Sequence, residues 1–156
     1  MSVVRGVPTM KVRDVYTQGA VVVSPRTSIA EARRTMEQHK IRRLPVVDGD
    51  RLVGIVTQMD LLRALPSIAT TLSIWEINYL LDKVRVEEIM TRDVLTVEPD
   101  TDLAAAAKLM IERKIGGLPV VDGGKVVGVI TESDIFRALV RILEAQGAQA
   151  AVGANA

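Results

Sequence analysis

Two short motifs in the chain pair a hydroxyl with a carboxylate at the same spacing. They are Thr57-x-x-Asp60 and Thr131-x-x-Asp134, and each stands just before an apolar run of helical period. A threonine followed three residues later by an acid is a capping box, which satisfies backbone N–H groups at a helix start. The same helix start offers free N–H groups to a phosphate, and a carboxylate can accept from both hydroxyls of a ribose. The motif therefore fits a structural role and also nucleotide binding.

Two arginines in the first half of the chain have no basic counterparts in the second half. Arg42 and Arg43 precede the first LPVV segment, whereas Gly116 and Gly117 precede the second. Guanidinium groups match the oxygen geometry of a phosphate, so a site beside the arginines favours an anionic ligand. The alternative is a solvated strand edge, which needs no ligand. Two sites built on the two halves should therefore be unequal.

Other kinds of catalytic or metal chemistry find no support in the sequence. The chain has no cysteine, which excludes disulfides, thiolate nucleophiles and cysteine zinc sites. Its one histidine, His39, has no second histidine with which to form a metal site or a catalytic triad. No acidic pair is placed by a motif as general acid and general base. We therefore expect a protein that is not an enzyme, holds no metal and requires no cofactor.

Charge and hydropathy argue against two classes of partner. Lys and Arg number 20 against 19 Asp and Glu, and a net charge of +1 provides no field that would gather nucleic acid. No apolar run approaches the roughly 20 residues that a membrane helix needs. We expect a cytoplasmic protein with no nucleic-acid or membrane partner.

The elements that must position the two motifs occur twice in the chain. Adding 74 to a residue number aligns the halves without a gap, so that Pro45 meets Pro119 and Gly54 meets Gly128. Between positions 41 and 65, 14 of 25 residues are identical to their partners. We predict one repeat over residues 10–65, a helical connector over 66–83, a second repeat over 84–143 and a flexible tail over 144–156.

Each repeat carries the same order of apolar patterns. The runs AVVV at 20–23 and VLTV at 94–97 predict first strands, and apolar spacing of three and four predicts helices near 29–36 and 103–110. Asp-Gly pairs at 48–49 and 122–123 predict tight hairpins, and a last helix follows each hairpin. The fold class is α/β, of the α+β kind, with two β-α-β-β-α units. One unit of about 55 residues buries too little surface to stand alone, so two copies should cover each other.

The connector between the repeats is expected to be an ordered helix. Ser73 and Glu76 have capping-box spacing, and Ile74, Ile77, Leu80 and Leu81 recur at helical spacing. The segment also contains Trp75, the only tryptophan of the chain. This helix is expected to dock on the repeat pair or on a second subunit.

The doubled pattern LPVVDG…VGIVTQMD and LPVVDG…VGVITESD resembles a tandem pair of CBS domains. This is the cystathionine-β-synthase-type repeat, which pairs into a Bateman module, and the resemblance covers about residues 10–143. It implies two β-α-β-β-α repeats packed by pseudo-twofold symmetry. It also implies two clefts for adenosine-containing ligands such as AMP, ADP, ATP or S-adenosylmethionine. The connector SIWEINYLL looks like that of stand-alone bacterial CBS proteins of the acetoin-utilisation type.

The resemblance also implies roles for particular residues. The ribose would be bound by the acids of the two motifs, the phosphate by their threonines and by the two arginines, and the base by residues near the first strand of each repeat. These are, in turn, Asp60 and Asp134; Thr57 and Thr131; Arg42 and Arg43; and Ser24 and Thr96. For the last pair a plain strand end is the alternative.

Two functions follow as hypotheses. The first is a regulatory module in which the ligand biases the packing of the two repeats and so alters the surface shown to a regulated enzyme or transporter. The second is a dimerisation or interaction module whose clefts are structural or empty, served by the Trp75 connector and by the apolar last helix with Ile135, Phe136, Leu139 and Ile142. A homodimer is expected under both hypotheses, whereas saturable nucleotide binding separates them.

Overall fold

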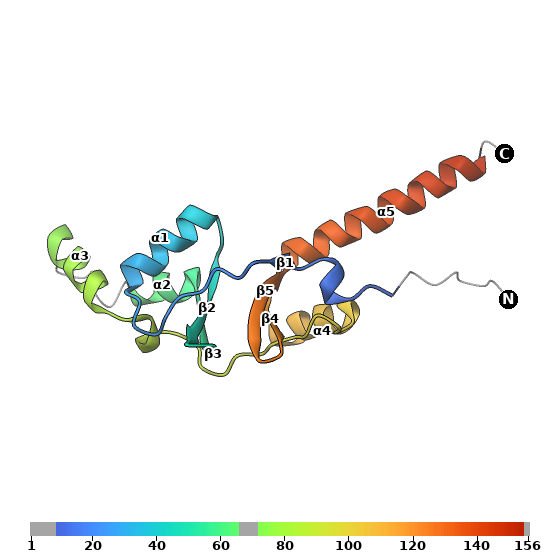
Figure 1. Cartoon of the computed structure of the whole chain (residues 1–156). Coiled ribbons are helices and arrows are strands. Elements are labelled where there is room, and N and C mark those ends of the chain that lie inside the picture. The colour runs from blue at the N-terminus through green and yellow to red at the C-terminus, as the bar shows by residue number, and fades with distance from the viewer. Residues whose placement is uncertain (1–8, 66–71, 155–156) are drawn as a thin grey trace. The chain divides into compact units, whose positions relative to one another are not determined.

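Each half of the chain folds into a β-hairpin accompanied by helices, as the repeat predicts (Figure 1). The computed structural model describes residues 9–65 and 72–154. The start of the predicted connector, 66–71, and the last two residues of the predicted tail lie outside the described residues. The elements form two units. The repeat-1 unit comprises residues 19–95 with 123–126, and the repeat-2 unit comprises the described residues up to 18 with 96–122 and 127–154.

The repeat-1 unit contains a two-stranded sheet and three helices. Its elements are α1 (Ile29–His39), β2 (Arg43–Asp48), β3 (Arg51–Thr57), α2 (Gln58–Ala64), α3 (Ile74–Lys83) and the 3-10 turn η2 (Val86–Glu88). β2 and β3 pair antiparallel from Arg43 opposite Thr57 to Asp48 opposite Arg51. Gly49 has a φ of +63° in the turn, as the predicted Asp-Gly hairpin requires.

The repeat-2 unit contains the same hairpin with an added edge strand. Its elements are η1 (Val12–Asp14), β1 (Thr17–Gln18), α4 (Leu103–Arg113), β4 (Gly117–Asp122), β5 (Lys125–Thr131) and α5 (Glu132–Ala154). The strand order is β1-β5-β4. The mixed strand and helix content of both units confirms the predicted fold class.

The two cores are built from residues at equivalent positions. In each unit one face of the first helix is buried against the hairpin, at the spacing of three and four that the sequence predicts. The buried residues at these equivalent positions are Ile29, Ala32, Met36, Leu44, Val46 and Val56 in the first unit and Leu103, Ala106, Met110, Leu118, Val120 and Ile130 in the second. The sequence identity of the repeats therefore reflects a packing requirement in part.

The prediction of full first strands over 20–23 and 94–97 is wrong. Each run makes only a single parallel bridge, Val23 to Val46 and Val97 to Val120. At the first of them the Val23 N–H donates to the carbonyl of Pro45 at 3.1 Å, and the Val23 carbonyl accepts from Val47 at 2.8 Å. A turn follows at once, with Thr27 donating to Ser24, because Pro25 lies next along the chain and ends the extended run.

The first residues of each repeat pack in the unit formed by the other repeat. Residues that begin repeat 1 in the sequence pack in the repeat-2 unit, where Val12 donates to the carbonyl of Thr101 at 2.9 Å. Residues that begin repeat 2 pack in the repeat-1 unit, where Val86 donates to the carbonyl of Thr27 at 2.8 Å. Both valines are fully buried. Each repeat thus supplies the segment that closes the other repeat's core.

Each exchanged segment then lies against a glycine of the hairpin. Thr17 pairs with Val129 of β5, and a Cβ on Gly128 would come within 2.2 Å of the Thr17 carbonyl oxygen. In the repeat-1 unit a Cβ on Gly54 would come within 2.5 Å of the Met90 sulfur and 3.0 Å of the Thr91 carbonyl oxygen. The close approach explains why glycine stands at both positions.

Replacing Gly128 by alanine is expected to destabilise the protein more than replacing Gly54. The Cβ at 128 meets a backbone carbonyl, which cannot move without displacing β1, whereas the thioether beside 54 can rotate away. We expect Gly128→Ala to lower the free energy of unfolding by about 3 kcal/mol and Gly54→Ala by about 1 kcal/mol, measured by urea unfolding. Equal losses would contradict the role given to the Thr17 backbone.

The predicted connector helix is confirmed over α3. Ser73 and Glu76 form the capping box, with the Ser73 N–H donating to Glu76 at 2.7 Å and the Glu76 N–H donating to the Ser73 hydroxyl at 3.3 Å. The backbone hydrogen bond from Ser73 lowers the pKa of Glu76. α3 contacts α1 and buries Leu81, whereas Trp75 is 80% exposed.

The chain after Leu143 is helical, contrary to the tail predicted from its weak pattern. α5 continues to Ala154. Alanine, glutamine and glutamate are strong helix formers, and they outweigh the glycines at 147 and 153. The side chains described beyond Leu143 are exposed. This part of α5 therefore needs no apolar face, and the sequence shows no helical pattern there.

Candidate functional site

The first Thr-x-x-Asp motif caps α2 at the end of the repeat-1 hairpin. The Thr57 N–H donates to Asp60 Oδ2 at 2.8 Å, and the Asp60 N–H donates to Thr57 Oγ1 at 3.2 Å. The predicted capping box is therefore formed. Because the Thr57 oxygen acts as an acceptor here, its hydroxyl proton is not used by the capping box.

Both arginines lie beside this motif. Arg43 is the cross-strand partner of Thr57, and the carbonyl of Arg42 accepts from the N–H of Gln58 at 2.8 Å. Residues directly opposite in an antiparallel pair have Cβ atoms about 5 Å apart. The fold thus brings the Thr57 hydroxyl and the Asp60 carboxylate to the same end of the hairpin as Arg42 and Arg43. We call this set the repeat-1 cluster: Arg42, Arg43, Thr57 and Asp60.

Ser24 does not join the cluster within the repeat-1 unit. Val23 is level with Val46 in a parallel bridge, so Ser24 lies level with Val47, about 13 Å along β2 from Arg43. Its hydroxyl accepts from the N–H of Arg26 at 3.2 Å, which makes it part of the turn before α1. This local bond fits the strand-end alternative for Ser24.

The second motif has the same spacing but different surroundings. The Thr131 N–H donates to Asp134 Oδ2 at 2.9 Å, and here the Thr131 hydroxyl also donates to that oxygen, at 3.2 Å. The carbonyl of Gly116 accepts from the N–H of Glu132 at 3.1 Å, as the carbonyl of Arg42 accepts from Gln58 in the first repeat. Glycine has no side chain, so this position carries no positive charge in the second repeat. Thr96, the other residue predicted to contact the base, is exposed just before the bridge at Val97.

Two residues that the sequence did not single out complete the environment of Asp134. Thr17 Oγ1 donates to Asp134 Oδ1 at 3.2 Å, and an Arg137 guanidinium nitrogen donates to the same oxygen at 3.0 Å. Asp134 is only 3% exposed. Arg137 follows Asp134 by one helical turn and could have been suggested by spacing. Thr17 is 117 residues away, and no local pattern connects it to the motif.

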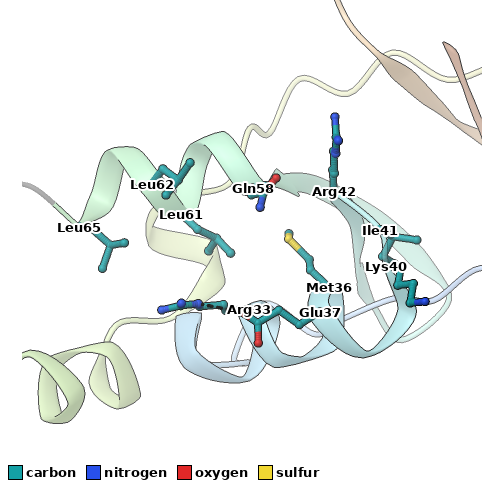
Figure 2. A pocket seen from close by; sticks show the side chains of 10 residues that line it. All are labelled: Arg33, Met36, Glu37, Lys40, Ile41, Arg42, Gln58, Leu61, Leu62 and Leu65. Carbon is teal, nitrogen blue, oxygen red and sulfur yellow. Dashed lines mark hydrogen bonds and ion pairs between the residues drawn. The ribbon is translucent and has the colours of Figure 1, made fainter. Parts of the chain in front are cut away.

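A pocket of about 430 Å³ opens between α1 and α2 of the repeat-1 unit (Figure 2). Its floor includes Met36 and Leu61, and the ion pair between Arg33 and Glu37, at 3.1 Å, lies on its α1 side. In Figure 2 the Arg42 side chain extends away from these α1 residues. The threonine and aspartate of the repeat-1 cluster do not line this pocket.

Metal and membrane sites are absent from the part of the chain that the structure covers. Over residues 9–65 and 72–154, no three His, Cys, Asp or Glu side chains are grouped closely enough to hold a metal ion. His39 is exposed on α1. None of the helices in these two ranges has the length and apolar character needed to cross a membrane.

The repeated fold and its two Thr-x-x-Asp motifs define a pair of CBS domains, and the chain belongs to the CBS domain family. A model of that family matches residues 12–67 and again residues 86–141. The chain spans only 22% to 45% of the length of the first four curated relatives that it matches.

Three solved structures similar to the chain are covered almost completely by it. A Vibrio cholerae protein described as an acetoin-utilisation protein is 34% identical, with 89% of this chain and 96% of that chain covered and a TM-score of 0.75. The CBS domain pair of MJ0100, bound to 5′-methylthioadenosine and S-adenosyl-L-methionine, is 34% identical over 85% and 97% of the two chains, with a TM-score of 0.72. CBSX2 bound to AMP is 37% identical over 85% and 97%, with a TM-score of 0.71.

Proposed function

We propose that this protein is a non-catalytic regulatory module of the cytoplasm that binds an adenosine-containing ligand. The observation that carries the proposal is the repeat-1 cluster, in which Arg42 and Arg43 lie at the same end of a hairpin as the Thr57 hydroxyl and the Asp60 carboxylate. A carboxylate suits the two hydroxyls of a ribose, and the other groups suit an anionic tail. Similar CBS pairs bind AMP or S-adenosylmethionine, which supports AMP, ADP, ATP or S-adenosylmethionine as the ligand class.

The proposed mechanism is a bias between two states of the module. A ligand shifts an equilibrium only by its difference in affinity for the two states, so the bound form must differ in the surface offered to a partner. We propose that this partner is an enzyme or transporter whose activity the module regulates. The protein itself would carry out no reaction.

Self-association is the second candidate function, and the surface of α5 favours it. Phe136, Leu139, Val140 and Leu143 are all exposed, at the spacing of one helix face. Ile135 and Ile142, also proposed for this role from the sequence, are only partly exposed. A contiguous exposed apolar stripe marks an interaction surface, and we propose a homodimer formed through it. A dimer is compatible with ligand binding, so nucleotide titration is needed to separate the two functions.

Adding AMP, ADP, ATP or S-adenosylmethionine is expected to raise the melting temperature of the protein. A ligand at about 100 times its dissociation constant stabilises by roughly 2.7 kcal/mol, which is about 5 to 10 °C for a domain of this size. Asp60→Ala should stay folded, with a melting temperature lowered by about 2 to 4 °C because the Thr57 N–H loses its capping acceptor, and should weaken binding at least about tenfold because the ribose loses its acceptor.

The matched control is Asp82→Ala, which removes an exposed acid of α3 in the same unit. It should bind as tightly as the unmodified protein. If none of the adenosine compounds shifts the melting temperature, the sensor proposal fails and the interaction module replaces it.

A further inference from the structure

The carboxylates of the two motifs differ in how fully their own chain uses them. A carboxylate offers about four lone-pair sites for hydrogen bonds. Asp134 accepts four: from the Thr131 N–H, from the Thr131 hydroxyl, from Thr17 and from Arg137. The buried carboxylate of Asp134 is therefore saturated.

Among the described residues, Asp60 accepts from only one of the four equivalent donors, the Thr57 N–H. The position equivalent to Thr17 is Thr91, and the position equivalent to Arg137 is Arg63, so both residue types are present. Within the described part of the chain, neither of them donates a hydrogen bond to Asp60. Thr91 is exposed and uses its backbone to pair with Ile55. The carboxylate of Asp60 is only partly buried and keeps acceptor capacity for a ligand.

The threonine hydroxyls of the two motifs also differ in whether the protein already uses their proton. The Thr57 oxygen accepts from the backbone of α2, so its proton can still be donated to a phosphate. The Thr131 hydroxyl gives its single proton to Asp134. A ribose or phosphate at the second motif would have to displace bonds that the protein already makes.

We propose that the two motifs have divided roles, with Asp60 binding the ligand and Asp134 acting as a positioning residue that fastens the exchanged strand β1 to the start of α5. The ligand-binding role of Asp60 rests on the proposed function, whereas the positioning role of Asp134 does not. Thr17 is the hydrogen-bonding side chain of β1 that reaches Asp134, and β1 is only two residues long. Its attachment to β5 therefore depends on this side-chain bond as well as on the backbone. Because only Asp60 of the two motif acids binds the ligand, one chain binds one nucleotide through these motifs.

The stability of paired valine variants tests the fastening role. Thr17→Val keeps the shape and strand propensity of threonine but removes one donor to a buried carboxylate, and should lower the melting temperature by about 3 to 6 °C. Thr91→Val, the matched variant in the other repeat, should change it by less than about 1 °C. Combined with Asp134→Asn, Thr17→Val should add little further loss, since the two side chains act as one bond. Equal effects of the two valine variants, or full additivity with Asp134→Asn, would overturn the role of Asp134.

Calorimetric titration with AMP tests the division of binding. We expect about one AMP per chain and, for Thr17→Val, a dissociation constant within about threefold of that of the unmodified protein. Two AMP molecules per chain, or loss of AMP in Asp134→Asn at an unchanged melting temperature, would overturn the division. If AMP and the other adenosine compounds fail to bind the unmodified protein, the proposed function fails, whereas the coupling of Thr17 with Asp134 is still decided by the melting temperatures.

Discussion

Replacing both Arg42 and Arg43 by glutamine is expected to weaken AMP binding by about 100-fold while leaving adenosine binding within about threefold. A hydrogen bond to a charged group contributes about 1.5 to 3 kcal/mol, so two of them account for roughly two factors of ten. Glutamine keeps the length and polarity of the side chain but removes the charge and the fork that fits a phosphate. Adenosine has no phosphate and so does not depend on the guanidinium groups. Titration calorimetry with the two compounds measures the difference.

Arg51→Gln provides the control for this pair of substitutions. Arg51 is an exposed arginine of the same hairpin, at the end of β3 that lies opposite Asp48 and away from the cluster. It should bind both compounds normally. If the double variant loses adenosine as strongly as AMP at an unchanged melting temperature, the arginines do not recognise the phosphate.

The features that the sequence predicts correctly are those that neighbouring residues determine. Asp-Gly at 48–49 permits the positive φ of a tight turn, and Ser73 with Glu76 satisfies the first N–H groups of α3. The Thr57-x-x-Asp60 box forms for the same reason. The position of Arg43 opposite Thr57, in contrast, does not follow from the two-residue turn, because a register shift between Val46 and Val47 moves the pairing by one residue.

The features that the sequence misses depend on residues far apart in the chain. Val12 and Val86 occupy equivalent positions, so the repeat is equally consistent with each valine packing in its own copy. The exchange is set by backbone hydrogen bonds to Thr101 and Thr27, which leave no local pattern. Thr17 reaches Asp134 as part of the exchanged segment of the repeat-2 unit. The motif alone therefore presents two equal sites, although the fold makes them unequal.

Replacing Phe136 and Leu143 by aspartate is expected to raise the dissociation constant of the homodimer by about 100-fold or more, because apolar anchors in an interface commonly contribute 2 kcal/mol or more each. At 100° per residue, the stripe formed by these residues with Leu139 and Val140 lies on the face of α5 opposite the buried Asp134 and Ala138. The substitutions therefore add charge to the outer face without entering the core of the repeat-2 unit. Sedimentation velocity over a range of concentrations gives the mass of each species.

The control for the stripe is Gln149→Asp, which adds one negative charge, half of that added by the double variant, to an exposed position of α5 outside the stripe. The control should dimerise like the unmodified protein, and both variants should keep its melting temperature. If the double variant remains dimeric, the interface lies elsewhere, and if the unmodified protein is a monomer, the homodimer proposal fails. The nucleotide titration remains informative in both cases because the repeat-1 cluster and the α5 stripe share no residue. A monomer that binds AMP would be a sensor acting on another protein, and the exposed apolar stripe of α5 would then be the first surface to test for that contact.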